Sequence, residues 1–337
     1  YAGDAMPVAR ALTAVADRVI THPNVMNGAM MYWPHDAVQY VEGFALDEFA
    51  AGRWGLRPTV SQRVGLLLDA GIEPELRLRH LQAADAARAT LGVCLMAHAT
   101  TEEPLDVEVE MSPAGASWGT LRRPDALLRA ARRLQAAGCT AIAVVARFPD
   151  EDVDMLAAYR AGDGVDSIGG AEAIISHLIT KELGIPCAHA PAMPVFELEP
   201  HVAPRACAEE LGFTFLPCIL VNLSRAPRLL DGSERPQADD IWREDLDALI
   251  VPANACGGAA VLALLESRTL IVAVEENTCE MDVPPEAVGA PGRIVRVRSY
   301  MEAIGLLAAH RAGVNPACLT SKVAPMSDLE APAEEAA

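Results

Sequence analysis

A cysteine followed by two glycines is the first feature of the sequence that could do chemistry. Residues 251–262 read VPANACGGAAVL, in which Cys256, Gly257 and Gly258 precede an apolar stretch of helical composition. If the helix begins near Gly258, its dipole would stabilise a Cys256 thiolate and lower the pKa of the thiol. A small residue packed in a tight turn is the alternative for the sulfur, and we favour it. The open glycine amides still predict that the loop holds an anion.

Two histidines follow predicted strands and are each followed by proline within two residues. His22 stands in ITHPN and His189 in CAHAP, and His98 in LMAHATT is a looser third case. An imidazole titrates near pH ~6.5, so each could act as an acid or a base. A ring that only caps a strand end is the structural alternative. The three could also assemble a metal site, but no H-x-H or H-E-x-x-H spacing supports one. No metal and no other cofactor is predicted.

Short apolar runs alternate with amphipathic stretches along the chain, and these elements must position the candidate residues. Runs such as TAIAVVARF suit strands that are covered on both faces. The pattern predicts an α/β fold with Rossmann-like parallel sheets, helices on both faces and a cleft at the carboxyl ends of the strands. Strands are expected at 17–21, 63–69, 92–97, 105–111, 140–147, 185–190, 213–222, 248–252, 269–275 and 294–298. Helices are expected at 4–16, 37–50, 74–91, 124–137, 151–161, 170–183, 203–211, 257–266 and 300–312.

The same reading divides the chain into two lobes and a tail. An N-terminal α/β lobe is predicted at residues 1–115 and a C-terminal Rossmann-like lobe at residues 116–320. Residues 321–337 are acidic and rich in proline and alanine, which predicts disorder.

Polar residues gather after most predicted strands, where ligands bind in open α/β sheets. Ordinary turn chemistry accounts for some of them. The candidate catalytic residues are His22, His189, Cys256 and Glu275. The candidate substrate-binding residues are Asn24, Asn27, Ser117, Arg147, Asn222, Arg225, Asn254, Gly257, Gly258 and Asn277.

Composition excludes several classes of function. The net charge of the 337 residues is −19 and no basic stripe is present, so neither nucleic acid nor a membrane surface is an expected partner. The eight cysteines form no C-x-x-C pair, and no apolar run approaches ~18 residues, which predicts reduced thiols in the cytoplasm. No P-loop occurs. The expected partner is a small anionic metabolite, and a homo-oligomer stays open.

These features favour a cytoplasmic enzyme that uses acid/base chemistry on a small carboxylated or phosphorylated metabolite. Isomerisation, racemisation and lyase-type elimination fit that description. Two alternatives stay open: a metal-dependent hydrolase with strand-end histidines, and a non-catalytic regulatory protein that binds a small molecule.

Several long segments of the chain are distinctive, among them ITHPNVMNGA, YVEGFALDEFAAGRWGL, RVGLLLDAGIEPELRLRHLQ, GGAEAIISHLI and EELGFTFLPCILVNLSRAP. On these segments the chain resembles a known family, the domain of unknown function three-three-two-six. The family is met largely in photosynthetic bacteria and plants. The resemblance implies a further strand and glycine turn before Tyr1, and it implies no activity and no catalytic residues.

Overall fold

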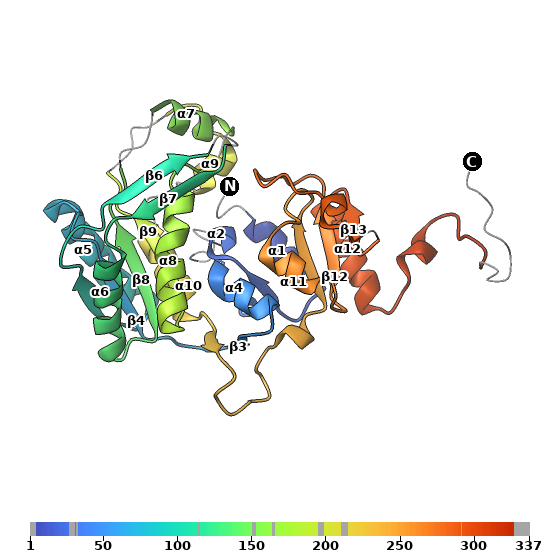
Figure 1. Cartoon of the computed structure of the whole chain (residues 1–337), viewed down its shortest axis with the longest axis horizontal. Helices are drawn as coiled ribbons and strands as arrows, with labels where there is room; N and C mark the ends of the chain where they lie inside the picture. Colours follow the sequence, from blue (N-terminus) through green and yellow to red (C-terminus); the bar gives the residue numbers. More distant parts are fainter. Residues whose placement is uncertain are drawn as a thin grey trace.

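A computed structural model of the chain describes residues 5–26, 31, 33–112, 115–149, 153–163, 166–194, 199–209, 215–290 and 292–326. Parallel sheets alternate with helices along this part of the chain, which confirms the predicted α/β fold (Figure 1). The strands are β1 (Val19–Thr21), β2 (Val38–Tyr40), β3 (Gly55–Arg57), β4 (Val64–Leu68), β5 (Leu95–Thr100), β6 (Val107–Met111), β7 (Ser117–Leu121), β8 (Ala141–Ala146), β9 (Cys187–Pro191), β10 (Arg228–Leu230), β11 (Ala248–Pro252), β12 (Leu270–Val274) and β13 (Ile294–Val297). The helices are α1 (Met6–Leu12), α2 (Pro23–Met26), α4 (Gly43–Ala50), α5 (Pro74–Leu91), α6 (Pro124–Ala136), α7 (Val153–Ala161), α8 (Gly169–Leu183), α9 (Pro204–Glu209), α10 (Phe215–Ser224), α11 (Ala259–Leu264) and α12 (Tyr300–Arg311).

The larger sheet has four parallel strands in the order β5-β4-β8-β9. Successive side chains of a strand point to opposite faces, and both faces of this sheet are covered. Leu66 and Val145 pack with α5 and α10 on one face, whereas Leu67 and Val144 pack with α6 and α8 on the other. Burial on both faces explains why β4 and β8 are continuous apolar runs.

The smaller sheet has three parallel strands in the order β11-β12-β13 and is also covered on both faces. Ile271 and Ala273 face α11, and Val272 and Val274 face α12. Helix α4 contacts both α8 of the larger sheet and α11 of the smaller one, and Figure 1 shows it between the two sheets. This helix therefore links the two halves of the molecule.

The larger sheet contains strands from both predicted lobes. Strands β4 and β5 precede residue 115, whereas β8 and β9 follow it, and β4 pairs directly with β8. Residue 115 therefore does not separate two sheets. Of the predicted disordered tail, residues 327–337 lie outside the described residues.

Two expected elements differ in the structure. The predicted strand at 213–222 is wrong, because helix α10 occupies Phe215–Ser224. Its side chains pack against β8, β9 and α5, and a helix that is apolar over most of its surface has the same continuous pattern as a buried strand. The predicted helix at 37–50 is instead the short strand β2 followed by α4.

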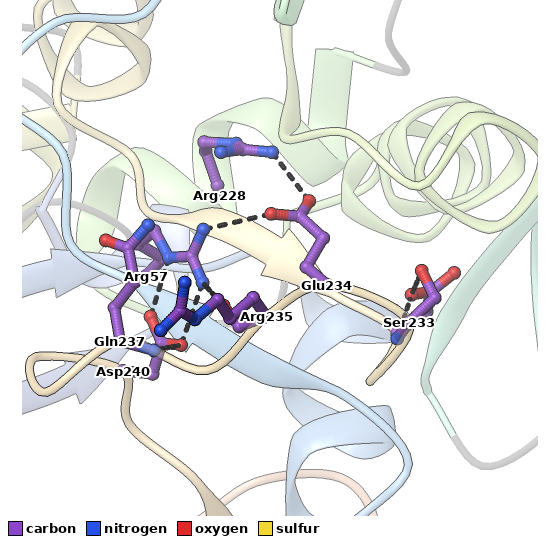
Figure 2. Close-up of polar contacts among 8 residues, drawn as sticks. Arg57, Arg228, Ser233, Glu234, Arg235, Gln237 and Asp240 are labelled. Atoms are coloured by element: carbon purple, nitrogen blue, oxygen red, sulfur yellow. Dashed lines mark hydrogen bonds and ion pairs between the residues drawn. The ribbon is translucent and has the colours of Figure 1, made fainter.

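Arg57 on β3 forms hydrogen bonds and ion pairs with the polar segment that follows α10 (Figure 2). Strand β10 pairs antiparallel with β3. The Arg57 guanidinium then donates to the carboxylates of Glu234 and Asp240 and to the carbonyl oxygen of Arg235. Arg228 donates to the other oxygen of Glu234, so one carboxylate joins two strands.

Candidate functional site

Strands β1 and β2 end at the same edge and place His22 and Glu42 next to each other. The two strands run parallel, with Thr21 opposite Tyr40. The Val41 amide donates to the carbonyl oxygen of Thr21 at 3.0 Å, which extends the pairing by one residue. His22 and Glu42 follow directly at the carboxyl ends, where parallel strands present ligand-binding side chains.

The Glu42 carboxylate holds the start of α4 and also pairs with a histidine from another helix. Its Oε2 accepts from the amides of Phe44 at 2.8 Å and Ala45 at 3.4 Å, which caps the helix. Its Oε1 forms an ion pair with Nδ1 of His177 on α8. The Glu42 side chain is 2% exposed, whereas that of His177 is 41% exposed. The hydrogen bond from His177 to Glu42 raises the pKa of His177 above its ordinary value.

Gly43 provides the space in which two imidazoles approach α4. A β-carbon at this position would lie 2.9 Å from Cε1 of His177 and 3.3 Å from Nε2 of His22. The first distance is shorter than van der Waals contact allows, so a larger residue would displace the ring. Glycine therefore permits both histidines to reach the N-terminus of this helix.

His189, on strand β9 of the larger sheet, is the third histidine at this site. Its Nδ1 lies 3.1 Å from Oγ of Ser176, and its Nε2 lies 3.7 Å from Oε2 of Glu172. Burial is the main cause that lowers the pKa of His189 to about 3, and the nearby His22 and His177 lower it further. Burial also lowers the pKa of His22 to about 4, against the opposing charge of Glu42. Both rings are therefore neutral near pH 7.

We refer to these five side chains as the imidazole cluster: His22, Glu42, Glu172, His177 and His189. The sequence predicted His22 and His189, and the structure brings them together. The sequence did not point to Glu42, Glu172 or His177. The candidates were residues at predicted strand ends, whereas Glu172 and His177 lie on helix α8. Glu172, Ser176 and Thr180 are buried polar residues at four-residue spacing within an apolar helix, and this stripe was the available signal.

Several polar atoms of the described residues are buried without a hydrogen-bond partner. Beside the cluster they include the Tyr40 hydroxyl and Oγ1 of Thr180, and within it Oε1 of Glu42 and Nδ1 of His177 have their ion pair with each other. Tyr40 belongs to the paired end of β2, and Thr180 lies one turn beyond Ser176 on α8. Burial raises the pKa of Tyr40, and the electrostatic influence of Cys187, Cys218 and Glu42 raises it further. Such groups cost free energy when they stay unpaired, so they mark a place where a ligand could supply partners.

Cys256 lies in the smaller sheet's half of the molecule and is not an activated thiol. Gly258 is the N-cap of α11, so the cysteine precedes the helix by two residues rather than lying in its first turn. Its side chain is fully buried, and Sγ contacts the carbonyl oxygen of Ala253 at 3.7 Å. Burial raises the pKa of the Cys256 thiol. A lowered pKa was the less favoured of the two interpretations of Cys256, and burial acts in the opposite direction.

The other candidates around Cys256 bond to neighbouring segments of the same half of the molecule. The Asn254 side chain donates to the carbonyl oxygen of Cys279 at 2.7 Å and accepts from the Cys279 amide at 2.9 Å. The Asn277 side chain donates to the Tyr300 hydroxyl at 2.7 Å. Glu275 pairs with Arg296 at 3.8 Å. Two further candidates belong to the same turn, namely Gly257 beside Val283, and Gly258.

The remaining candidates lie apart from the imidazole cluster. Ser117 accepts from the Gly170 amide at 3.0 Å, Arg225 pairs with Asp36, and the Asn222 amide donates to the carbonyl oxygen of Cys218 at 3.0 Å. Asn222 and Arg225 were expected at a strand end, but Asn222 lies within α10 and Arg225 follows it. The Asn24 side chain and Asn27 lie outside the described part of the structure.

Arg147 borders a surface pocket of about 360 Å³, which is also lined by Glu73, Glu75, Leu76, Arg79 and Pro194.

The described part of the chain holds no cluster of metal-ligating side chains. Among these residues, no three or more histidine, cysteine or acidic side chains are arranged to hold a metal ion. His98 is exposed on β5, at the opposite edge of the larger sheet from His189.

None of the described helices has the length and apolar character needed to cross a bilayer. All eight cysteines lie within the described ranges and are free thiols, as the sequence predicted.

Comparison with known proteins identifies the family. The family model described as "Protein of unknown function (DUF3326)" matches residues 1–320. The chain belongs to this family. It is also 52% identical over 321 residues to a protein of Synechococcus sp. named an uncharacterized lipoprotein, and the match covers 95% of this chain and 89% of that relative. The resemblance predicted from the sequence segments is confirmed.

The name of this DUF3326 relative corrects two predictions. Lipoproteins are held at a membrane by attached lipid, so the name conflicts with the predicted cytoplasmic location and with the predicted cytoplasmic acid/base enzyme. The predicted location depended on scattered cysteines and on short apolar runs. Neither feature reports on lipid attachment, which is a covalent modification and requires no membrane-spanning helix.

Proposed function

We propose that this DUF3326 protein is a membrane-anchored protein that binds a small polar molecule at the imidazole cluster. The relative that is named a lipoprotein supports the anchoring part of the proposal. The binding part rests on one observation: His22 and His177, from separate elements, both approach Gly43, where a β-carbon would lie 2.9 Å from one ring and 3.3 Å from the other.

The composition of the cluster favours binding over a purely structural role. A structural network in a protein interior normally satisfies its polar atoms. Here the Tyr40 hydroxyl and the Thr180 hydroxyl are buried without partners in the described part of the chain, while the ring of His177 is open to solvent. A ligand that enters beside His177 would reach neutral imidazoles and carboxylates that can bond to it.

A thermal-shift screen of the full chain tests the binding part. The library should contain amino acids, organic acids, sugars, nucleosides and amines, and each hit should be repeated with His177→Gln. This ring is half exposed, so its replacement perturbs the core little. We expect hits that are lost in His177→Gln and retained in Cys256→Ala, which lies in the other half. If no compound stabilises the protein, or if all hits survive His177→Gln, the binding proposal is wrong.

Fractionation of cells that produce the natural full-length protein tests the anchoring part. We expect the protein in the washed membrane fraction, and we expect detergent to release it. Recovery of the protein in the soluble fraction without detergent would contradict membrane anchoring, whatever the outcome of the ligand screen.

A further inference from the structure

The larger sheet ends in a strand whose outer edge is open. In the part of the chain that is described, β5 pairs with β4 on one side and with no strand on the other. Its six residues, LMAHAT, include no proline, lysine or acidic residue, and these are the residues that commonly protect such an edge from pairing. The strand at the other edge, β9, is instead largely buried and contacts α8 and α10.

The backbone of His98 points toward the open edge of β5. The Thr101 amide donates to the carbonyl oxygen of Leu68 on β4 at 2.9 Å. Backbone groups of successive residues alternate between the two sides of a strand, and the register with β4 is regular from Ala97 to Thr100. The amide and the carbonyl group of His98 therefore face away from β4. They are a donor and an acceptor that a further strand could use.

A second copy of the same strand fits this donor and this acceptor. In an antiparallel pair of strands, two opposed residues exchange both of their amide-to-carbonyl bonds. A two-fold axis beside His98 would set His98 of one copy against His98 of the other, so that both bonds form between identical residues. The same register sets Met96 opposite Thr100 and Cys94 opposite Glu102.

The charges at the two ends of β5 are complementary in that arrangement. Exposed Arg63 lies at the N-terminal end, where the amide of the next residue, Val64, donates to the carbonyl oxygen of Cys94 at 2.8 Å. The Nε of Arg63 donates to the carbonyl oxygen of Gly138 at 2.7 Å rather than to a carboxylate. Half-exposed Glu102 lies just beyond the C-terminal end. Antiparallel copies would bring Arg63 of each near Glu102 of the other, twice across the interface.

Exposed apolar side chains border the same end of the strand. Met96 on β5 is 47% exposed, and Leu91, the last residue of α5, is 43% exposed. A second strand along β5 would cover part of this apolar surface. Burial of apolar surface stabilises an interface, so it would add to the backbone bonds and to the charge pairs.

We infer that two copies of this chain associate through β5 of each copy, in antiparallel orientation around His98. The two four-stranded sheets would then form one continuous sheet. This inference goes beyond the proposed function and does not depend on it, because β5 and the imidazole cluster lie at opposite edges of the larger sheet. Pairing through β5 leaves the cluster accessible in both copies.

Sedimentation velocity of the full chain between about 1 and 200 μM tests the inference. We expect the wild-type protein to change from one chain to two as its concentration rises. His98→Pro removes an amide that faces away from β4, so it should melt like the wild type and stay monomeric. His98→Gln keeps that amide and should associate like the wild type.

An exchange of charges gives a second test, which leaves the backbone of β5 unaltered. Arg63→Glu and Glu102→Arg should each weaken association by at least about tenfold, because like charges then face each other twice. The variant that combines both changes should regain most of the affinity, because opposite charges meet again. Glu182→Arg makes the same kind of change on α8, away from β5, and should leave association unchanged.

A wild-type protein that stays monomeric at the highest concentration would overturn the inference. Association of folded His98→Pro that is as strong as that of the wild type would also overturn it. If His98→Pro does not fold, the charge variants decide, and affinity that is the same in Arg63→Glu, in Glu102→Arg and in the wild type would overturn the antiparallel pairing. None of these results bears on ligand binding at the imidazole cluster or on membrane anchoring.

Discussion

Glu42 and His177 form an ion pair that joins the N-terminus of one helix to the middle of another. The same carboxylate caps α4 with its second oxygen, so a single buried side chain fixes both the helix and the imidazole. Because α4 also contacts the smaller sheet through α11, this pair connects the imidazole cluster to both halves of the molecule. Glu42 therefore orients the His177 ring, while α8 fixes its backbone.

Glu42→Gln should lower the pKa of His177 toward its ordinary value. The hydrogen bond to Glu42 is the main cause of the raised pKa, and glutamine keeps the shape of the side chain but removes its charge. A pH titration of the histidine ring protons by NMR would measure the change. Glu48→Gln, on the same helix, pairs with Arg53 and is the control. An unchanged His177 pKa in Glu42→Gln would contradict the role assigned to Glu42.

Acid should destabilise the protein through His22 and His189. Their pKa values are lowered to about 4 and about 3, so the unfolded state binds protons that the folded state does not. The contribution of the two neutral rings to stability is complete above pH ~6.5. It is lost as the pH falls from there through the two lowered pKa values, at up to about 1.4 kcal/mol per pH unit for each histidine. Urea unfolding at pH 7.5, 6 and 5 would measure this slope. His189→Gln should flatten it, whereas exposed His98→Gln should not, and equal slopes would count against burial of the His189 ring.

Much of the fold could be predicted from the sequence, because strands that are buried on both faces leave a distinct pattern. The runs at β8 and β12 are continuous and rich in β-branched residues, and both were predicted as parallel strands. Helix α10 was mistaken for a strand because apolar residues cover most of its surface. The three-residue strand β2 was missed because so short an element has no measurable periodicity.

The candidate site could be predicted only in part. His22 and His189 follow or lie in strands, so reading along the strands found them. Glu42 and His177 are brought to the site by the tertiary packing of α4 and α8, which no local pattern reports. The strand-end rule also selected residues such as Asn254, whose side-chain amide joins two loops by bonding to the backbone of Cys279.

Gly43→Ala should destabilise the protein and abolish any binding at the imidazole cluster. The added methyl group would lie 2.9 Å from His177, so the ring must move out of its ion pair with Glu42. The displaced ring is the far end of a half-exposed side chain, so we expect a loss of at most about 1 kcal/mol in the free energy of unfolding, the low end of the range for overpacked sites. Gly305→Ala is the matched control, because its β-carbon would have nothing within 4 Å and alanine favours the helix α12. That variant should be as stable as the wild type or up to about 1 kcal/mol more stable. Chemical denaturation would measure both, and equal stabilities would contradict the close contact.

Cys256 should react slowly with thiol reagents. Its side chain is fully buried and its pKa is raised, so little thiolate is available to a reagent. Cys279, which is exposed and lies close in the same half, is the internal control. Brief alkylation followed by peptide mass spectrometry should find Cys279 modified and Cys256 largely unmodified in the folded protein, and both modified in denaturant. Equal rates in the folded protein would show that the loop opens readily and would restore Cys256 as a candidate nucleophile.

Asp240→Asn should lower the melting temperature by several degrees. Arg57 and Asp240 are 183 residues apart in the sequence, yet Nε donates to Oδ1 at 2.6 Å and Nη2 to Oδ2 at 2.9 Å, as Figure 2 shows. The Asp240 side chain is only 2% exposed, and a two-point pair of this kind is lost when one oxygen becomes an amide.

The effect of Asp240→Asn should depend on pH. The bond to Arg57 lowers the pKa of Asp240 to about 2, so the contribution of Asp240 to stability is present above pH ~4 and is lost as the pH falls toward 2. The difference in melting temperature between Asp240→Asn and the wild type should therefore shrink below pH ~4. Asp239→Asn, at the exposed neighbouring position, should melt with the wild type at every pH. If the two variants melt at the same temperature at pH 7, Arg57 does not hold this segment to β3.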